Sequence, residues 1–197
     1  MENILKELTS FYSGKKVFVS GHSGFKGVWL SLFLKYLGAD VYGYSIDIPT
    51  VPSLFELINL EKLVNSIKGD VKNIENLKKE MDEIKPEIVF HLAAQPLVIE
   101  SYLNPLETYL TNVNGTLNIL EVIRTTDYVK SFVNVTTDKV YKNNEVIWGY
   151  RENEELDGFD PYSNSKSCSE LITKTYKRAL IKNKCAISTV RAGNVIG

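Results

Sequence analysis

Short apolar runs alternate along the chain with longer segments in which apolar residues recur every three or four positions. The short runs predict strands at residues 16–20, 41–46, 64–67, 87–94, 132–136 and 186–191. The longer segments predict helices at about 25–38, 74–84, 106–126 and 162–183, with a short helix or arm at 1–14 and irregular chain at 48–60. Strands that alternate with helices form a parallel sheet with right-handed crossovers. The pattern therefore predicts an α/β fold, a doubly wound parallel sheet with helices on both faces.

The first predicted strand ends in a glycine turn, Gly21 to Gly27, that leads into an apolar helix. The unpaired N–H groups and the positive dipole end at such a helix start suit a pyrophosphate. In this interpretation Gly21 permits the tight turn, Gly24 lets phosphates approach the backbone, and Gly27 lets the helix pack closely on the strand. The spacing is GxxGxxG, which on its own also fits an ordinary βα turn.

An acidic residue, Asp47, follows the second predicted strand. It lies twenty residues after Gly27, the offset at which a carboxylate can hold the 2′-hydroxyl of an NAD ribose. No arginine stands close by in the sequence to bind a 2′-phosphate, which favours NAD over NADP. The alternative is an aspartate in a surface turn before Pro49.

Several of the candidate residues share one edge of the predicted sheet. Ligands of doubly wound folds bind at the C-terminal ends of the strands. The residues that fall at such ends are Gly21, Asp47, Asp70, Ala94, Thr137 and Asn194. The small side chains of Ala93 and Ala94 leave space there for a ligand, or allow tight packing. This common edge supports a dinucleotide site more strongly than the glycines do.

Composition narrows the class of protein. With 44% apolar and 24% charged residues in 197, the chain is typical of a soluble globular domain, predicted as one unit over residues 1–197. A net charge of −1 provides no basic surface for nucleic acid or membrane partners. Two cysteines are too few for a disulfide framework, and no signal-like or membrane-spanning run is present. We expect a cytoplasmic protein.

A second constellation concerns proton chemistry. Tyr162 and Lys166 stand four residues apart at the start of a predicted helix, on one helical face. A nearby ammonium would favour the phenolate and lower the pKa of the tyrosine, which could then act as a general base. Such pairs also occur by chance in many helices, so the position after the fifth strand is what gives this one weight.

Longer motifs carry a family resemblance. The loop Gly21-His22-Ser23-Gly24-Phe25-Lys26-Gly27 with Tyr162-x-x-x-Lys166 resembles the extended short-chain dehydrogenase/reductase superfamily, whose fold is of the Rossmann type. Within it the chain resembles the CDP-glucose 4,6-dehydratases, through residues 52–56, 91–98, 148–153, 160–163 and 191–197. The pair Asp138-Lys139 also resembles that branch, since relatives that act on dTDP-glucose usually carry Asp-Glu there.

The resemblance implies NAD as cofactor, CDP-glucose as substrate and CDP-4-keto-6-deoxyglucose as product. Tyr162 would remove the proton of the sugar 4-hydroxyl, Thr137 would hydrogen-bond the same oxygen, and Lys166 would hold the nicotinamide ribose and tune Tyr162. Asp138 is the candidate acid for the leaving 6-hydroxyl, and Lys139 would assist deprotonation of C5. The implied cofactor contacts are Gly21, Ser23, Gly24, Phe25, Lys26, Gly27, Asp47, Asp70, Val71, Ala93, Ala94, Gln95, Tyr162 and Lys166.

Other residues follow the resemblance more loosely. Asn112 resembles the structural asparagine near the family's active site and is grouped with the substrate side, as are Asn194 and Gln95. Gln95 could touch substrate or nicotinamide. We expect no metal site, because His22 lies inside the phosphate loop and His91 fits a satisfied core histidine.

Three expectations concern the whole protein. The two long helices resemble those that pair two subunits in a homodimer. The chain stops where relatives continue into a C-terminal substrate lobe, which we expect to be missing here. Two rival interpretations stay open: another NAD-dependent nucleotide-sugar enzyme, such as a 4-epimerase, or a non-catalytic NAD-binding fragment. The pair Asp138-Lys139 argues against an epimerase, because epimerases need no elimination catalysts.

Overall fold

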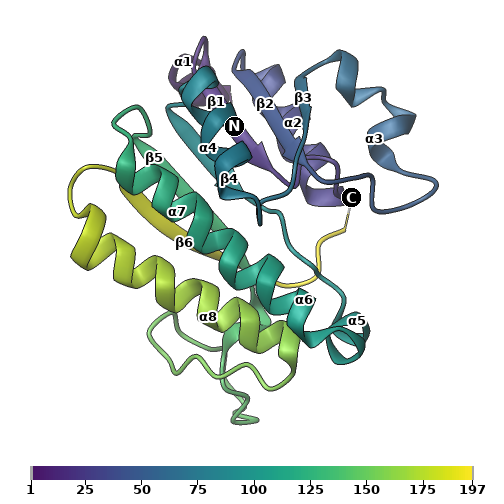
Figure 1. Ribbon diagram of the computed structural model, residues 1–197, viewed down its shortest axis with the longest axis vertical. Helices are drawn as coiled ribbons and strands as arrows, with labels where there is room; N and C mark the ends of the chain where they lie inside the picture. Colours follow the sequence, from purple (N-terminus) through teal and green to yellow (C-terminus); the bar gives the residue numbers. More distant parts are fainter. Residues whose placement is uncertain (1, 197) are drawn as a thin grey trace.

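The computed structural model describes residues 2–196 as a parallel sheet with helices on both faces (Figure 1). Met1 and Gly197, the ends of the domain predicted at 1–197, lie outside the described residues. The strands are β1 (Lys16–Ser20), β2 (Asp40–Ser45), β3 (Asn65–Lys68), β4 (Ile88–His91), β5 (Ser131–Thr137) and β6 (Ala186–Ala192). Their order is β3-β2-β1-β4-β5-β6, and every neighbouring pair is parallel. This topology confirms the predicted doubly wound sheet.

Most of the helices fall close to their predicted ranges, but those at 54–57 and 98–103 were not predicted. The helices are α1 (Glu2–Tyr12), α2 (Phe25–Tyr36), α3 (Leu54–Leu57), α4 (Ile74–Ile84), α5 (Val98–Leu103), α6 (Pro105–Tyr109), α7 (Gly115–Thr125) and α8 (Pro161–Thr175). A π-helical turn, Leu110–Asn114, joins α6 to α7 into the long helix predicted at 106–126, and another, Tyr176–Ile181, extends α8. Short 3-10 turns occupy Leu60–Lys62 and Asp138–Val140.

The alternation of side chains along β1 explains the two core layers. Val17 and Val19 point to one face and pack with α2 and α3, whereas Phe18 points to the other and packs with α4 and α7. In Figure 1, α7 and α8 run side by side across this second face. Both faces of the sheet are therefore covered, as buried parallel strands require.

Two segments differ from the sequence prediction. The strand predicted through Ala94 ends at His91, because the Ala93 N–H turns to the Ser20 hydroxyl at 3.4 Å. The segment predicted as irregular contains α3, whose start is capped by Ser53 accepting the Glu56 N–H at 3.1 Å. No helix of the described residues 2–196 is both long and apolar enough to cross a membrane.

Candidate functional site

The phosphate loop is shaped by backbone contacts that only glycine permits. Gly21 has a φ of +77°, and a Cβ there would lie 2.6 Å from the Ala93 nitrogen. A Cβ on Gly27 would lie 2.1 Å from the Gly21 carbonyl oxygen, so α2 could not approach β1 so closely. Gly24 differs, because its Cβ would meet one atom at 3.5 Å, an ordinary contact. The side of Gly24 is thus open to a ligand.

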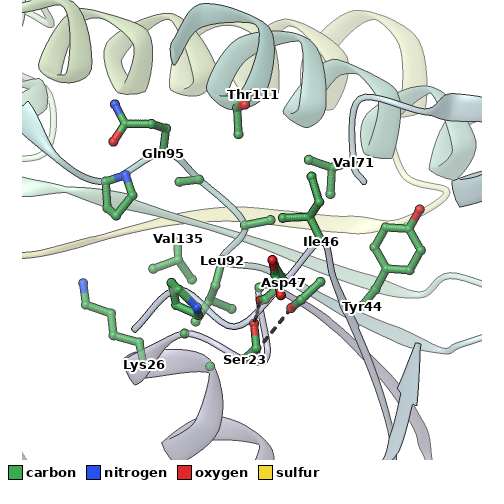
Figure 2. A pocket seen from close by; sticks show the side chains of 18 of the residues that line it. Ser23, Lys26, Tyr44, Ile46, Asp47, Val71, Leu92, Gln95, Thr111 and Val135 are labelled. Carbon is green, nitrogen blue, oxygen red and sulfur yellow. Dashed lines mark hydrogen bonds between the residues drawn. The ribbon is translucent and has the colours of Figure 1, made fainter. Parts of the chain in front are cut away.

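The loop opens into a cavity of about 510 Å³ at the C-terminal edge of the sheet. Figure 2 shows Lys26 and Gln95 at one end of this cavity, with Tyr44 and Val71 at the other. Every residue predicted to contact the cofactor lines it: Gly21, Ser23, Gly24, Phe25, Lys26, Gly27, Asp47, Asp70, Val71, Ala93, Ala94, Gln95, Tyr162 and Lys166. The structure therefore gathers these residues from five separate chain segments into one site.

Asp47 and Asp70 end two neighbouring strands on the rim of the cavity. The Asp47 carboxylate is exposed and accepts the Ile48 N–H at 2.8 Å, while its carbonyl accepts the Ser23 hydroxyl at 2.6 Å. The Asp70 carboxylate accepts the Lys72 N–H at 2.9 Å. Both carboxylates are held by local backbone on the cavity rim, and the Asp70 carboxylate also pairs with the Lys72 ammonium at 3.6 Å.

The candidate catalytic residues Thr137, Tyr162 and Lys166 lie at the end of β5 and in the first two turns of α8. We call this region the catalytic edge. Asp160 caps α8 by accepting the Ser163 N–H at 3.0 Å, which fixes the first turn that carries Tyr162. Lys166 is buried, and its Nζ donates to the Val135 carbonyl at 3.0 Å. Thr137 is also buried and donates to the Asp138 carboxylate at 3.0 Å. Tyr162 and Lys166 line the cavity, and a hydrogen bond joins Thr137 to Tyr162.

The predicted lowering of the Tyr162 pKa is wrong for this structure. Burial raises the pKa of the Tyr162 phenol, and the hydrogen bond with Thr137 opposes that rise only in part. The nearby carboxylates of Asp138 and Asp160 add to the rise, while the Lys166 Nζ donates to the Val135 carbonyl. Burial and the nearby Lys26 ammonium lower the pKa of Lys166 itself to about 8, against an opposing effect of the Glu170 carboxylate.

Asn112 joins the loop after β4 to α8 through its side-chain hydrogen bonds. It is fully buried, and its side-chain carbonyl accepts the Gln95 N–H at 2.8 Å. Its amide donates to the Gln95 carbonyl at 3.0 Å and to Ser165 at 2.9 Å. These contacts fit the structural asparagine that the resemblance implies, and its grouping with the substrate side stays a prediction. Gln95 lines the cavity, although its amide donates to Thr108 at 2.9 Å.

Five predicted residues lie outside the cavity lining: Asn112, Thr137, Asp138, Lys139 and Asn194. Asp138 and Lys139 are exposed in the turn after β5, and Asn194 is exposed after β6. A Cβ on Gly193 would lie 3.3 Å from the Asp138 carboxylate, so the segment that carries Asn194 passes beside this turn.

Both histidines are buried within hydrogen-bonding networks. His91 lies 2.7 Å from Ser20 Oγ and 3.1 Å from Thr116 Oγ1, and burial lowers its pKa to about 3. This confirms a satisfied core histidine. His22 is 2% exposed, and both of its ring nitrogens meet serine hydroxyls. Among residues 2–196 no group of three His, Cys, Asp or Glu is arranged to hold a metal.

The sequence analysis missed part of the cavity wall. Tyr44 is the second-last residue of β2 and Ile46 follows the strand directly, so the strand-end rule that selected Asp47 could have found them. Lys72 and Glu107 form an ion pair between the loop after β3 and α6, and both line the cavity. Nothing in the local sequence signals that pair, because it depends on how α6 packs.

Fold and cavity together define a Rossmann-type α/β domain with its ligand site at the strand ends. A family model described as GDP-mannose 4,6 dehydratase matches residues 18–192. The chain belongs to this GDP-mannose 4,6-dehydratase family.

Individual relatives refine the comparison. The chain is 52% identical to a CDP-glucose 4,6-dehydratase of Salmonella typhimurium, over 95% of this chain and 54% of that protein. It is 26% identical to a dTDP-D-glucose 4,6-dehydratase of Dictyostelium discoideum, over 93% of this chain and 44% of that protein. The chain thus spans about half the length of the curated relatives it matches.

Solved structures show the same fold. An epimerase of Methanothermobacter thermautotrophicus matches with a TM-score of 0.83 and 26% identity, covering 95% of this chain and 54% of that one. A dTDP-glucose 4,6-dehydratase of Bacillus anthracis, solved in complex with NAD, matches with a TM-score of 0.74 and 22% identity, covering 90% of this chain and 55% of that one.

Proposed function

We propose that the chain is the cofactor-binding and catalytic part of a nucleotide-sugar 4,6-dehydratase, converting CDP-glucose to CDP-4-keto-6-deoxyglucose and water. The observation that carries this proposal is that the phosphate loop, Tyr162 and Lys166 line one cavity. The 52% identity to the Salmonella CDP-glucose 4,6-dehydratase supports CDP-glucose as the substrate. In this proposal residues 1–197 act as one NAD-binding domain.

The residues present fit NAD. The cavity of about 510 Å³ lies within the range of cofactor sites. The open side of Gly24 leaves room for a pyrophosphate oxygen near the start of α2. Lys26 and Lys166 provide positive charge on the cavity wall, and Asp47 provides a carboxylate for a ribose hydroxyl.

Bound NAD supplies the acceptor for the C4 hydride and the donor that returns it to C6. Tyr162 takes the proton of the sugar 4-hydroxyl, and Thr137 hydrogen-bonds the same oxygen. Lys166 uses one N–H on the Val135 carbonyl, which leaves two for the nicotinamide ribose and for Tyr162. Burial raises the pKa of the Tyr162 phenol, so in this proposal Lys166 must stabilise the phenolate when the substrate is bound.

The 5,6-elimination falls to the turn after β5. The 4-ketone acidifies the C5 proton. Lys139 removes this proton directly if its amine is neutral, or assists the removal electrostatically if its amine is charged. Asp138 protonates the leaving 6-hydroxyl. Both side chains are exposed beside Thr137, so a bound sugar can reach them from the catalytic edge.

The test is incubation with CDP-glucose and NAD, following the 4-keto-6-deoxy product by its absorbance in alkali. UDP-glucose and dTDP-glucose serve as substrate controls, and a longer gene product serves as the protein control. We expect product from CDP-glucose and none from UDP-glucose or dTDP-glucose. Interconversion of UDP-sugars would indicate an epimerase, and NADH binding without product from either protein would indicate a non-catalytic domain.

A tyrosine variant connects that activity to the site. Tyr162→Phe should lower the rate by about 10²- to 10⁴-fold, the usual contribution of a positioned acid or base. The matched control is Tyr102→Phe, because Tyr102 is 58% exposed on α5 and does not line the cavity. Equal rates for the parent and Tyr162→Phe would contradict the assigned role.

We also propose that two copies pair through the long helices. Leu106 and Leu110 on the α6 helix and its π turn are 72% and 40% exposed, and Leu171 on the neighbouring α8 is 48% exposed. Burying such side chains against a second copy would remove apolar surface from water. Sedimentation of the parent and of Leu106→Glu tests this, with a dimer expected only for the parent.

A further inference from the structure

His22 is directed away from the cavity although it lies in the phosphate loop. Its Nδ1 lies 2.8 Å from Ser45 Oγ, and its Nε2 lies 2.6 Å from Ser66 Oγ. Ser45 ends β2, and Ser66 belongs to β3. Since hydroxyls donate or accept, both ring nitrogens are satisfied in either neutral tautomer. One imidazole therefore ties the loop to two neighbouring strands.

The contact continues from Ser45 back into the loop. Ser45 Oγ accepts the Ser23 N–H at 3.2 Å, and the Ser23 hydroxyl donates to the Asp47 carbonyl at 2.6 Å. Figure 2 shows Ser23 and Asp47 together at the cavity, which both residues line. A continuous chain of hydrogen bonds thus runs from β3 through His22 to the backbone at the phosphate and ribose ends of the site.

The sheet leaves space for the His22 ring at Gly43. A Cβ on Gly43 would lie 2.1 Å from His22 Cδ2. Gly43 pairs with Val19 in β1 and with Ser66 in β3. The Phe55 ring closes the site, edge-on to the imidazole at a centroid distance of 5.4 Å. A residue with no side chain in the middle of β2 is thereby explained, because the ring occupies its place.

We propose that His22 is a positioning residue for the dinucleotide, bracing the phosphate loop against β2 and β3 so that Ser23 and Asp47 are held in register. The inference rests on the proposed function, since it assumes a dinucleotide in this cavity. His22 acts through Ser45 and Ser23 and does not itself line the cavity. Without the brace, the ligand must order the loop on binding, which weakens affinity.

The first test measures NADH affinity by fluorescence. His22→Ala should bind NADH about tenfold more weakly, the scale of the cost of ordering a loop. His22→Asn should retain most of the affinity, because its amide can reach Ser45 from the Nδ1 position. His22→Gln, whose amide can reach Ser66 and not Ser45, should lose as much as alanine. Equal affinities for the Asn and Gln variants would overturn the proposal, even if His22→Ala fails to fold.

A second test separates positioning from mere stability. Gly43→Ala alone should weaken NADH binding about as much as His22→Ala, because the methyl group displaces the ring. In the double variant that methyl group fills space left by the imidazole, so the melting temperature should recover while affinity stays low. If affinity recovers together with stability, the role of His22 is only structural. Gly149→Ala is the matched control, since a Cβ there meets nothing within 4 Å.

The outcomes distinguish this inference from the proposed function. If the parent binds no NADH, the dinucleotide assignment fails and this inference fails with it. If the parent binds NADH and His22→Ala binds it equally well, only the role of His22 is overturned. Amide exchange in the unliganded chain gives an independent readout, with faster exchange at Ser23 expected in His22→Ala.

Discussion

The two halves of the site are built differently. Around the phosphate loop the geometry comes from backbone contacts, such as the close approach of Gly27 to the Gly21 carbonyl. At the catalytic edge it comes from side chains packed across long separations in the sequence. Glu170 on α8 is 4% exposed and pairs with Arg191 on β6 at 2.6 Å, while also accepting the Thr136 hydroxyl at 2.6 Å.

The difference teaches where each half is vulnerable. Backbone geometry is intolerant of any added atom but does not depend on charge. A buried ion pair depends on both partners, because removing one leaves an uncompensated charge.

The largest expected effect is at Gly27. Gly27→Ala would place a Cβ 2.1 Å from the Gly21 oxygen and 2.7 Å from the His22 Cα, both backbone atoms. Because neither atom can move without shifting β1 or α2, NADH binding should fall below detection in a fluorescence titration. Gly24→Ala should fold normally, since its one contact lies at 3.5 Å. Full NADH affinity in Gly27→Ala would show that the loop is less constrained than we infer.

The same contrast explains how much the sequence could reveal. Glycines and apolar runs act locally, so the loop, the positions of the strands and part of the cavity lining were predictable. The partner of Lys166 was not, because the Val135 carbonyl comes from a strand 31 positions away in sequence. The π turn that carries Thr111 and the pairing of Lys72 with Glu107 likewise follow from helix packing. The raised pKa of Tyr162 reflects burial, which spacing alone does not show.

The second prediction concerns the buried ion pair between Glu170 and Arg191 at the catalytic edge. Glu170→Ala leaves the Arg191 guanidinium in a largely buried position without its partner, which should cost about 3–5 kcal/mol of unfolding free energy. Urea denaturation measures the loss. The matched control is Glu121→Ala, which removes a more exposed pair with Arg124 on α7 and should change the midpoint little. Similar midpoints for the two variants would mean that the buried pair has no special role.

The third prediction concerns how the free energy of unfolding depends on pH through the two buried histidines, His22 and His91. Burial lowers the pKa of His22 to about 4 and of His91 to about 3, so the unfolded chain binds more protons below pH 6.5. Their stabilising contribution is therefore present above pH 6.5 and is lost as the pH falls toward those values. Each should account for about 2 kcal/mol of the unfolding free energy lost between pH 7 and 4.5.

Difference profiles isolate these two groups from carboxylates that titrate in the same range. Urea midpoints of the parent, His22→Asn and His91→Asn are compared at pH 7 and pH 4.5. The urea midpoint of each variant should fall less between pH 7 and pH 4.5 than that of the parent, because one acid-sensitive group has been removed. A variant profile parallel to that of the parent would show that the corresponding histidine does not resist protonation in the folded chain.

The smallest expected effect concerns the ion pair on the cavity rim. Lys72 bridges Glu107 on α6 and Asp70 at 3.6 Å, and its side chain is 27% exposed. A partly exposed pair of this kind contributes at most about 1 kcal/mol and is screened by salt. Lys72→Met should therefore speed NADH dissociation only a few-fold in stopped-flow measurements, and high salt should reproduce the change in the parent.

The control is Lys78→Met, which removes a pair with Asp82 within α4. This variant should leave NADH dissociation unaltered, since neither residue lines the cavity. Equal NADH dissociation rates for Lys72→Met and Lys78→Met would show that the ion pair on the cavity rim does not help to hold NADH. The backbone of the phosphate loop would then be the preformed part of the site.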